Sequence, residues 1–359
     1  MSLPIESSLA RYLVDDMHTA GEPVRIITGD APELQGETLL AKRRQAKAEF
    51  DVVRQRLMSE PRGHADMYGV WPTAAHHPDA ALAVLFIHNG GYSTMCGHAT
   101  IAMGRWVVDQ GLVPKTPPLT RFGLECPCGL VQVEVATDAQ GNTGAVEFDS
   151  VTAFPYVMDA EIELPEHGKI RFDISYGGAY YAILPASRLG LSLLESPLET
   201  LIQMGRRITD AAREQLSIQH RDHSSGDLGF LYGTIITDDA QGSEPTGNLC
   251  IFGDGQVDRS PTGSGVTARL ALDHAKGLID VGEERLFRGL SGVPFSGRIA
   301  RVVEGETGSE GVIVRVAGQS FYTVRSEFVV EANDELRDGL PIAAQLGAIW
   351  AANGVTTTD

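Results

Sequence analysis

The chain has 359 residues, of which 43% are hydrophobic and 21% charged, a balance typical of a folded globular protein long enough for two domains. Its formal net charge of −18 disfavours nucleic acid and anionic membranes as partners, because both repel an acidic surface. No apolar run reaches the roughly 18 residues that cross a bilayer, and no charged-then-apolar leader opens the sequence, so we expect a cytoplasmic location.

The first part of the chain predicts strands around two helices. The 40 glycines of the whole chain indicate many tight turns and a strand-rich α/β or α+β protein. Strands are predicted within residues 11–29, 81–89, 129–137 and 145–151. One long helix is expected at 37–59, where helix formers dominate, and a second follows a glycine-rich loop and ends at Gly111.

Beyond about residue 160 the order of elements repeats. Strands are predicted within 170–186, 229–239, 247–255, 297–305, 311–318 and 319–330. Helices are expected near 196–217 and after a second loop at 258–265. The repeat predicts two similar domains, 1–160 and 161–334, that face each other across a cleft, with the tail at 335–359 packing back on the first.

Two loop-to-helix units occupy matching places in the halves. They read "MCGHATIA" from Met95 and "PTGSGVTA" from Pro261, so that Cys96 in the first corresponds to Thr262 in the second. Backbone N–H groups at two such helix starts predict a site for a carboxylate or phosphate. A cysteine there is expected to have a lowered pKa, because the helix field favours the thiolate. A thiolate beside a bound carboxylate is well placed to remove the proton alpha to it.

Three stretches together resemble the proline racemase family. They are "DDMHTAGEPVRI" (15–26), "NGGYSTMCGHATIA" (89–102) and "DRSPTGSG" (258–265), and they keep the family order across most of the chain. The resemblance implies two α/β domains of the diaminopimelate epimerase type. Each is a mostly antiparallel sheet around a central helix, with the active site between them. It also implies cofactor-independent chemistry, on a small imino acid of the hydroxyproline type, and a possible homodimer.

The resemblance assigns roles to the residues of both loops. Racemases and epimerases of the family carry a cysteine in each loop, whereas this chain has Cys96 and Thr262. That substitution is associated with the trans-3-hydroxy-L-proline dehydratase branch, so the implied activity is a hydro-lyase with Cys96 as the base. By motif position, backbone N–H groups would hold the carboxylate and Asp258 would accept a hydrogen bond from the ring ammonium. The carboxylate-binding positions are Gly97, His98, Gly263 and Ser264. At His98 an imidazole role is not expected, and Thr262 is left as either a hydrogen-bonding or a space-filling residue.

Two other readings stay open. One is an isomerase, a 4-hydroxyproline 2-epimerase or proline racemase, and the other is a non-catalytic carboxylate-binding relative. No metal is expected, because Cys126 and Cys128 lack the second ligand pair of a zinc site. Cys250 is expected in the core, and Asp227 is a weak candidate for contact with the substrate ring.

Overall fold

A computed structural model describes residues 8–221, 226–238, 245–304 and 310–340. Its α-helices are α1 (Leu39–Glu49), α2 (Asp51–Met58), α3 (Gly97–Asp109), α4 (Leu198–Gln215) and α5 (Gly263–Ala275), with a short 3₁₀ helix at Ala186–Leu189. Among the described residues, no helix is long and apolar enough to cross a membrane.

Strands make up most of the regular structure. In the first part of the chain they are β1 (Ser8–Thr19), β2 (Glu22–Gly29), β3 (Tyr68–Thr73), β4 (Ala80–His88), β5 (Gly91–Ser93), β6 (Leu119–Cys126), β7 (Gly129–Thr137) and β8 (Thr143–Asp149). In the second they are β9 (Phe154–Leu164), β10 (Gly168–Tyr176), β11 (Tyr180–Pro185), β12 (Leu231–Thr237), β13 (Thr246–Phe252), β14 (Gln256–Val257), β15 (Glu284–Arg288), β16 (Pro294–Glu304), β17 (Glu310–Gly318) and β18 (Ser320–Glu331).

The strands form a continuous ladder. Its order is β18-β1-β2-β3-β4-β6-β7-β8-β17-β16-β15-β13-β12-β11-β10-β9, with β5 beside β4 and β14 beside β13. The pairs β2–β3, β4–β6, β11–β12 and β13–β15 are parallel, and the other pairs of this ladder are antiparallel. The expectation of a mostly antiparallel mixed α/β fold is thereby confirmed.

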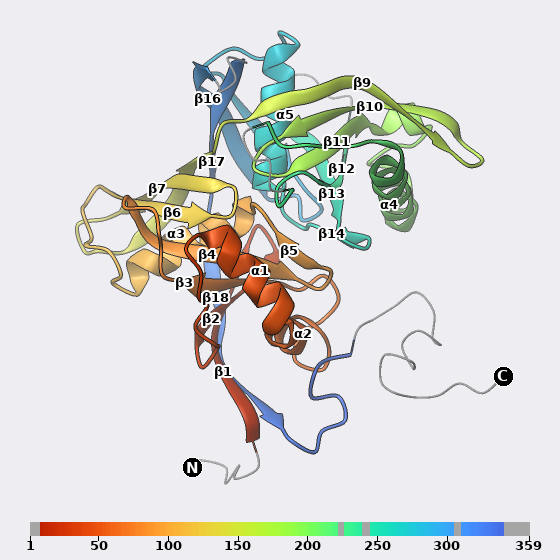
Figure 1. Cartoon of the computed structure of the whole chain (residues 1–359). Helices are drawn as coiled ribbons and strands as arrows, with labels where there is room; N and C mark the ends of the chain where they lie inside the picture. The colour runs from red at the N-terminus through yellow and green to blue at the C-terminus, as the bar shows by residue number, and fades with distance from the viewer. Residues whose placement is uncertain (1–7, 222–225, 239–244, 305–309, 341–359) are drawn as a thin grey trace, which may run out of the picture.

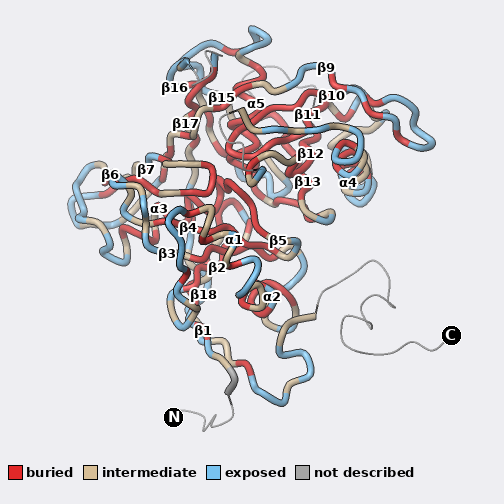
Figure 2. The backbone as a smooth tube through the Cα atoms, viewed as in Figure 1, coloured by how far each residue is buried: buried red, intermediate tan, exposed pale blue. Residues whose placement is uncertain are grey.

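Two lobes are visible in Figure 1, each with one helix inside its sheet. Helix α3 packs against β1, β7, β8 and β18, and α5 packs against β9, β10, β16 and β17. Both helices are apolar on nearly every side and buried along almost their whole length, as expected of a helix enclosed by a sheet. In Figure 2 the buried backbone is concentrated in these central layers and between the lobes.

Two strands do not follow the expected division of the chain at residue 160, because each pairs with strands of the other half. Strand β9 begins at Phe154 and pairs with β10, whereas β18 returns to pair with β1. The pairing of β17 with β8 brings the chain back from the second lobe to the first. The tail follows β18: Asp338 forms an ion pair with Arg56 at 2.7 Å, and Leu340 bridges to Glu60. Residues 341–359 of the expected tail lie outside the described residues.

The long helix expected at 37–59 is two helices. Phe50 separates α1 from α2 because its backbone (φ −127°, ψ 17°) is not helical. Asp51 then accepts hydrogen bonds from Arg54 and Gln55 in the first turn of α2. A carboxylate at a helix start is favoured by the helix field, and this local signal supports a new start at residue 51.

Candidate active site

The N-termini of α3 and α5 meet at two glycines. A Cβ built on Gly97 would lie 2.4 Å from the Cα of Gly263, so the two backbones approach more closely than any side chain allows. As first-turn residues, Gly97, His98, Gly263 and Ser264 have backbone N–H groups without an acceptor inside their own helix. The structure therefore brings two sets of N–H donors together, one from each lobe, as an anion site requires.

Cys96 is the N-cap residue of α3. Its backbone is extended (φ −148°, ψ 112°), and its sulfur accepts a hydrogen bond from the N–H of Ala99 at 3.4 Å. The side chain is only 5% exposed. Burial raises the pKa of the Cys96 thiol well above its usual value, and the Asp258 and Glu22 carboxylates add to the rise, against the hydrogen bond from Ala99. The lowered pKa expected from the helix field is therefore wrong for this arrangement, because burial outweighs the hydrogen bond from Ala99 that favours the thiolate.

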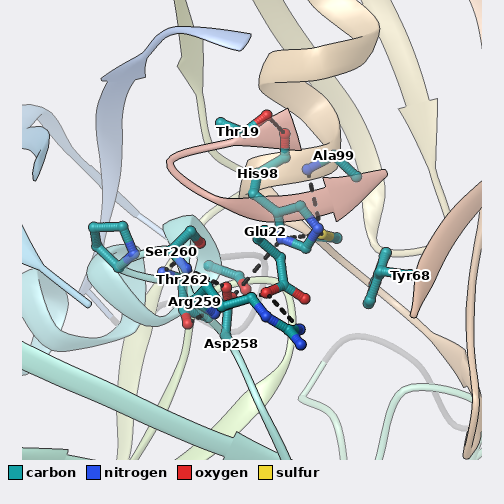
Figure 3. A network of polar contacts seen from close by, with 12 residues as sticks. Thr19, Glu22, Tyr68, His98, Ala99, Asp258, Arg259, Ser260 and Thr262 are labelled. Atoms are coloured by element: carbon teal, nitrogen blue, oxygen red, sulfur yellow. Dashed lines mark hydrogen bonds and ion pairs between the residues drawn. The ribbon is translucent and has the colours of Figure 1, made fainter. Parts of the chain in front are cut away.

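The imidazole of His98 contacts the sulfur. Cys96 Sγ lies 3.1 Å from His98 Nδ1 and 3.6 Å from Nε2 (Figure 3). The same Nδ1 lies 3.8 Å from Asp258 Oδ2. Burial lowers the pKa of His98, although Asp258 and the Pro23 carbonyl act against it, and a neutral imidazole is able to accept a proton from the thiol. The structure thus gives His98 a side-chain contact that sequence reasoning did not expect.

Asp258 is held by the loop that precedes α5. Its Oδ1 accepts a hydrogen bond from the N–H of Ser260 at 2.8 Å, and its Oδ2 accepts one from the hydroxyl of Thr262 at 2.7 Å (Figure 3). Thr262 adopts a left-handed backbone (φ 61°, ψ 89°), which is unfavourable for a β-branched residue. The Thr262 side chain therefore orients the carboxylate of Asp258.

A buried ion pair ties this loop to the first lobe. Glu22 Oε2 accepts hydrogen bonds from the backbone N–H of Arg259 at 2.7 Å and from its guanidinium at 3.4 Å. The guanidinium also lies 3.6 Å from Asp66 Oδ2. Burial, and secondarily the charge of Asp258, raise the pKa of Glu22 well above its usual value. Glu22 thus joins the "HTAGEP" turn to the loop that carries Asp258.

A small cavity lies between the helix starts. Of the residues predicted from sequence, it is lined by Cys96, Gly97, His98, Asp258, Thr262 and Ser264, while Gly263 lies at its edge against Gly97. The rest of the lining was missed by sequence reasoning and comes from Tyr68, Met95, Tyr181, Tyr232 and Phe252. Four of these five are aromatic residues in or next to apolar strands, a pattern that also describes ordinary core residues. No local signal in the sequence separates the two cases.

The weaker sequence candidates lie elsewhere. Cys126, Cys128 and Cys250 are buried free thiols outside the cavity lining, and burial raises the pKa of Cys128 to about 12. Asp227 forms an ion pair with Arg44 at 2.5 Å in a separate hollow between the lobes. It does not line the cavity at Cys96.

The arrangement suits one kind of chemistry. N–H donors from two helices can hold a carboxylate, Asp258 can accept a hydrogen bond from a cationic nitrogen, and a single cysteine faces the space between them. A hydroxyl, not a second thiol, stands opposite. Such an arrangement is chemically suited to abstraction of a proton alpha to a carboxylate, with backbone N–H groups placed to stabilise the developing negative charge.

Comparison with known proteins places the chain in a family. The model of the proline racemase family matches residues 14–341, and the chain belongs to that family. The trans-3-hydroxy-L-proline dehydratase of Homo sapiens is 49% identical over 333 residues, covering 91% of this chain and 93% of the human protein. A bacterial trans-3-hydroxy-L-proline dehydratase, from Colwellia psychrerythraea, is 42% identical over 325 residues, 90% of each chain.

Solved structures support the fold. A hydroxyproline epimerase from Agrobacterium vitis, with bound trans-4-OH-L-proline, has a TM-score of 0.86 at 24% identity and covers 98% of this chain and 100% of its own. A "probable proline racemase" from Agrobacterium radiobacter K84 also has a TM-score of 0.86 at 24% identity, covering 94% of this chain and 98% of its own. At this identity the likeness establishes the shared architecture alone.

Proposed function

We infer that this protein is a trans-3-hydroxy-L-proline dehydratase, a hydro-lyase. The single observation that carries the inference is the asymmetry of the site, with the Cys96 thiol at one helix start and the Thr262 hydroxyl at the other. The human and Colwellia relatives, at 49% and 42% identity over most of the chain, bear the name of this activity. A relative that only binds carboxylates would not require a buried thiol in contact with an imidazole at 3.1 Å.

Substrate binding follows from the charges of the cavity. The carboxylate of the imino acid is held by the N–H groups of Gly97, His98, Gly263 and Ser264. The ring ammonium donates a hydrogen bond to Asp258, which Thr262 and Ser260 orient. With both ends of the amino-acid group fixed, the alpha carbon lies between the two loops and its hydrogen faces Cys96.

Stereochemistry explains why one base suffices. In trans-3-hydroxy-L-proline the hydroxyl lies opposite the carboxylate, so the alpha hydrogen and the 3-hydroxyl share one face of the ring. The Cys96 thiolate takes the alpha proton, and N–H donors stabilise the charge that develops on the carboxylate. The carbon–oxygen bond at C3 then breaks, and the new thiol returns its proton to the leaving hydroxyl as water. The enamine product tautomerises to Δ1-pyrroline-2-carboxylate.

The initial thiolate needs a proton acceptor. His98 is placed for this role because its Nδ1 lies 3.1 Å from the sulfur, although burial, which raises the pKa of Cys96 and lowers that of His98, acts against the transfer. The resulting imidazolium would be stabilised by Asp258, whose Oδ2 is 3.8 Å away. We propose that these side chains carry out the reaction without a cofactor. A cytoplasmic location, a homodimer and a division into two domains, with Cys96 in one and Asp258 and Thr262 in the other, belong to the same proposal.

A substrate panel tests the function. Purified protein is incubated with trans-3-hydroxy-L-proline, trans-4-hydroxy-L-proline and L-proline, and the cyclic imine is trapped with o-aminobenzaldehyde. We expect imine from the 3-hydroxy compound only, and loss of that signal in Cys96→Ser. Epimerised 4-hydroxyproline without imine would establish the isomerase instead. A folded wild type that is inactive on all three but binds them would establish a carboxylate-binding protein.

A further inference from the structure

The hydroxyl groups of Tyr68 and Ser93 form a hydrogen-bonded pair near Cys96. Tyr68 on β3 is 2% exposed and lines the cavity together with Cys96. Its ring meets the ring of His98 edge-on, with the centroids 4.7 Å apart. Its hydroxyl lies 2.8 Å from Ser93 Oγ, and the Ser93 hydroxyl donates to the Met95 carbonyl at 3.0 Å. Figure 3 shows Tyr68 on the sulfur side of His98, away from the Asp258 loop.

The direction of these hydrogen bonds follows from counting hydrogens. A serine hydroxyl has one hydrogen to donate, and that of Ser93 goes to Met95. Ser93 Oγ therefore accepts at its contact with Tyr68, and the phenol is the donor. The phenol hydrogen thus points at a neutral oxygen while a potential anion, Cys96, lies beside it in the same cavity.

The Cys96 sulfur lines the same cavity and is a second potential acceptor for the phenol. A hydrogen bond between Tyr68 and Cys96 favours the thiolate and so acts to lower the pKa of Cys96, against burial. A hydrogen bond to a charged acceptor is stronger than one between neutral groups. When Cys96 ionises, the phenol should therefore turn from Ser93 to the sulfur. Ser93 keeps its bond to Met95.

We infer that Tyr68 and Ser93 form a hydroxyl switch that stabilises the Cys96 thiolate. When Cys96 is a thiol, the phenol of Tyr68 donates to Ser93, and when Cys96 is a thiolate, the phenol donates to the sulfur. Tyr68 is a positioning residue because it acts through Cys96. The switch supplies a hydrogen bond without adding a charge to a buried cavity. The inference rests on the proposed role of Cys96 as the base.

Two variants distinguish a switch from a merely structural contact. Tyr68→Phe removes the donor, so Cys96 should ionise at higher pH. Ser93→Ala removes the competing acceptor, so the phenol is free for the sulfur and Cys96 should ionise at lower pH. If the contact were only structural, the pH at which Cys96 ionises would shift in the same direction in both variants. The other titratable groups that face Cys96 are unchanged in both variants: Glu22, His98, Cys126, Tyr181, Tyr232 and Asp258.

The measurement is the rate of Cys96 alkylation by iodoacetamide as a function of pH, because only the thiolate reacts. Peptide mass spectrometry separates Cys96 from the other three cysteines. We expect the alkylation midpoint to rise in Tyr68→Phe and fall in Ser93→Ala, and kcat of Tyr68→Phe to drop about tenfold to a hundredfold with KM little changed. Tyr176→Phe, a buried tyrosine of β10 that packs on Phe154, is the matched control and should follow the wild-type alkylation profile.

Coincident profiles for wild type and Tyr68→Phe, or shifts of both variants in one direction, would overturn the switch. Thermal unfolding of each variant identifies a folding defect, and if Tyr68→Phe does not fold, the downward shift in Ser93→Ala alone decides the inference. Alkylation needs no substrate. Opposite shifts of the alkylation midpoint in a protein that forms no imine would support the switch and refute the dehydratase. Imine formation with coincident alkylation profiles would support the dehydratase and refute the switch.

Discussion

Thr262 shows how one side chain fixes the chemistry of a site. Its hydroxyl donates to Asp258 at 2.7 Å, so its hydrogen orients the carboxylate that we propose binds the substrate nitrogen. Delivery of that hydrogen to a carbanion would leave an alkoxide beside the Asp258 carboxylate, which is unfavourable, whereas a thiol would leave a thiolate. In the proposed mechanism the residue therefore contributes to binding and leaves proton transfer to Cys96.

This role predicts the effect of Thr262→Cys. A second thiol would face the alpha carbon from the side opposite Cys96, so we expect exchange of the alpha hydrogen with inversion of configuration, together with slower dehydration. With proline or 4-hydroxyproline in deuterated water, proton NMR measures exchange of the alpha hydrogen and chiral chromatography measures inversion. Thr262→Ser keeps the hydroxyl and should show no inversion. Deuterium exchange without inversion in Thr262→Cys would refute this account of the position.

The site residues differ in how far the sequence predicts them. Cys96, Asp258 and Thr262 stand in motifs whose order and spacing carry information, and the structure brings them to one cavity. Tyr68 and Tyr232 lie on strands and look like core residues, so their place beside the sulfur depends on how distant strands assemble. The direction of the Cys96 pKa shift was mispredicted because burial of the thiol, its largest cause, depends on how distant elements pack around it.

At the scale of elements, the close contact of α3 with α5 sets the spacing of the anion site. Gly97→Ala would place a Cβ 2.4 Å from Gly263 Cα and push the helix starts apart. We expect a loss of about 1–3 kcal/mol in the free energy of unfolding and a fall of at least tenfold in kcat/KM. Denaturant titration and imine trapping measure the two. Gly144→Ala, whose Cβ would meet its nearest neighbour at 3.4 Å, is the control and should change neither. Wild-type activity in Gly97→Ala would show that the spacing of the helices is not critical.

Periodicity predicts most elements but not their interruptions. The strands and the two central helices follow from apolar runs and loop-to-helix joints. The break at Phe50 does not, because helix formers continue on both sides of it and the local start signal at Asp51 was not recognised. The return of β18 to β1 was also missed, because strand partners far apart in the sequence leave no local signal.

At the scale of the molecule, the Glu22–Arg259 contact predicts how stability depends on pH. Burial raises the pKa of Glu22, so the folded protein binds this proton more tightly than the unfolded chain, in which the value is near 4.5. Stability from this group is present below the unfolded value and is lost as pH rises toward the raised folded value. Glu22→Gln removes the cost of a buried charge, and its free energy of unfolding should exceed that of wild type increasingly as pH rises from 4.5.

Thermal unfolding between pH 4.5 and pH 8 measures this difference. The Tm shifts by about 2–4 °C per kcal/mol for domains of roughly 150–250 residues. The exposed Glu195→Gln is the control and should parallel the wild type. A Glu22→Gln variant whose advantage shrinks as pH rises would show that the charged Glu22–Arg259 pair stabilises the contact between the lobes more than burial opposes it.

The central claim is that Cys96 alone removes the alpha proton and that water then leaves from the same face. Proton NMR of trans-3-hydroxy-L-proline in deuterated water, with wild type and Cys96→Ser side by side, tests it most directly. We predict that wild type forms Δ1-pyrroline-2-carboxylate, that the remaining substrate keeps its configuration, and that Cys96→Ser forms no imine. Accumulation of the inverted imino acid without imine, or wild-type turnover by a folded Cys96→Ser, would contradict the account.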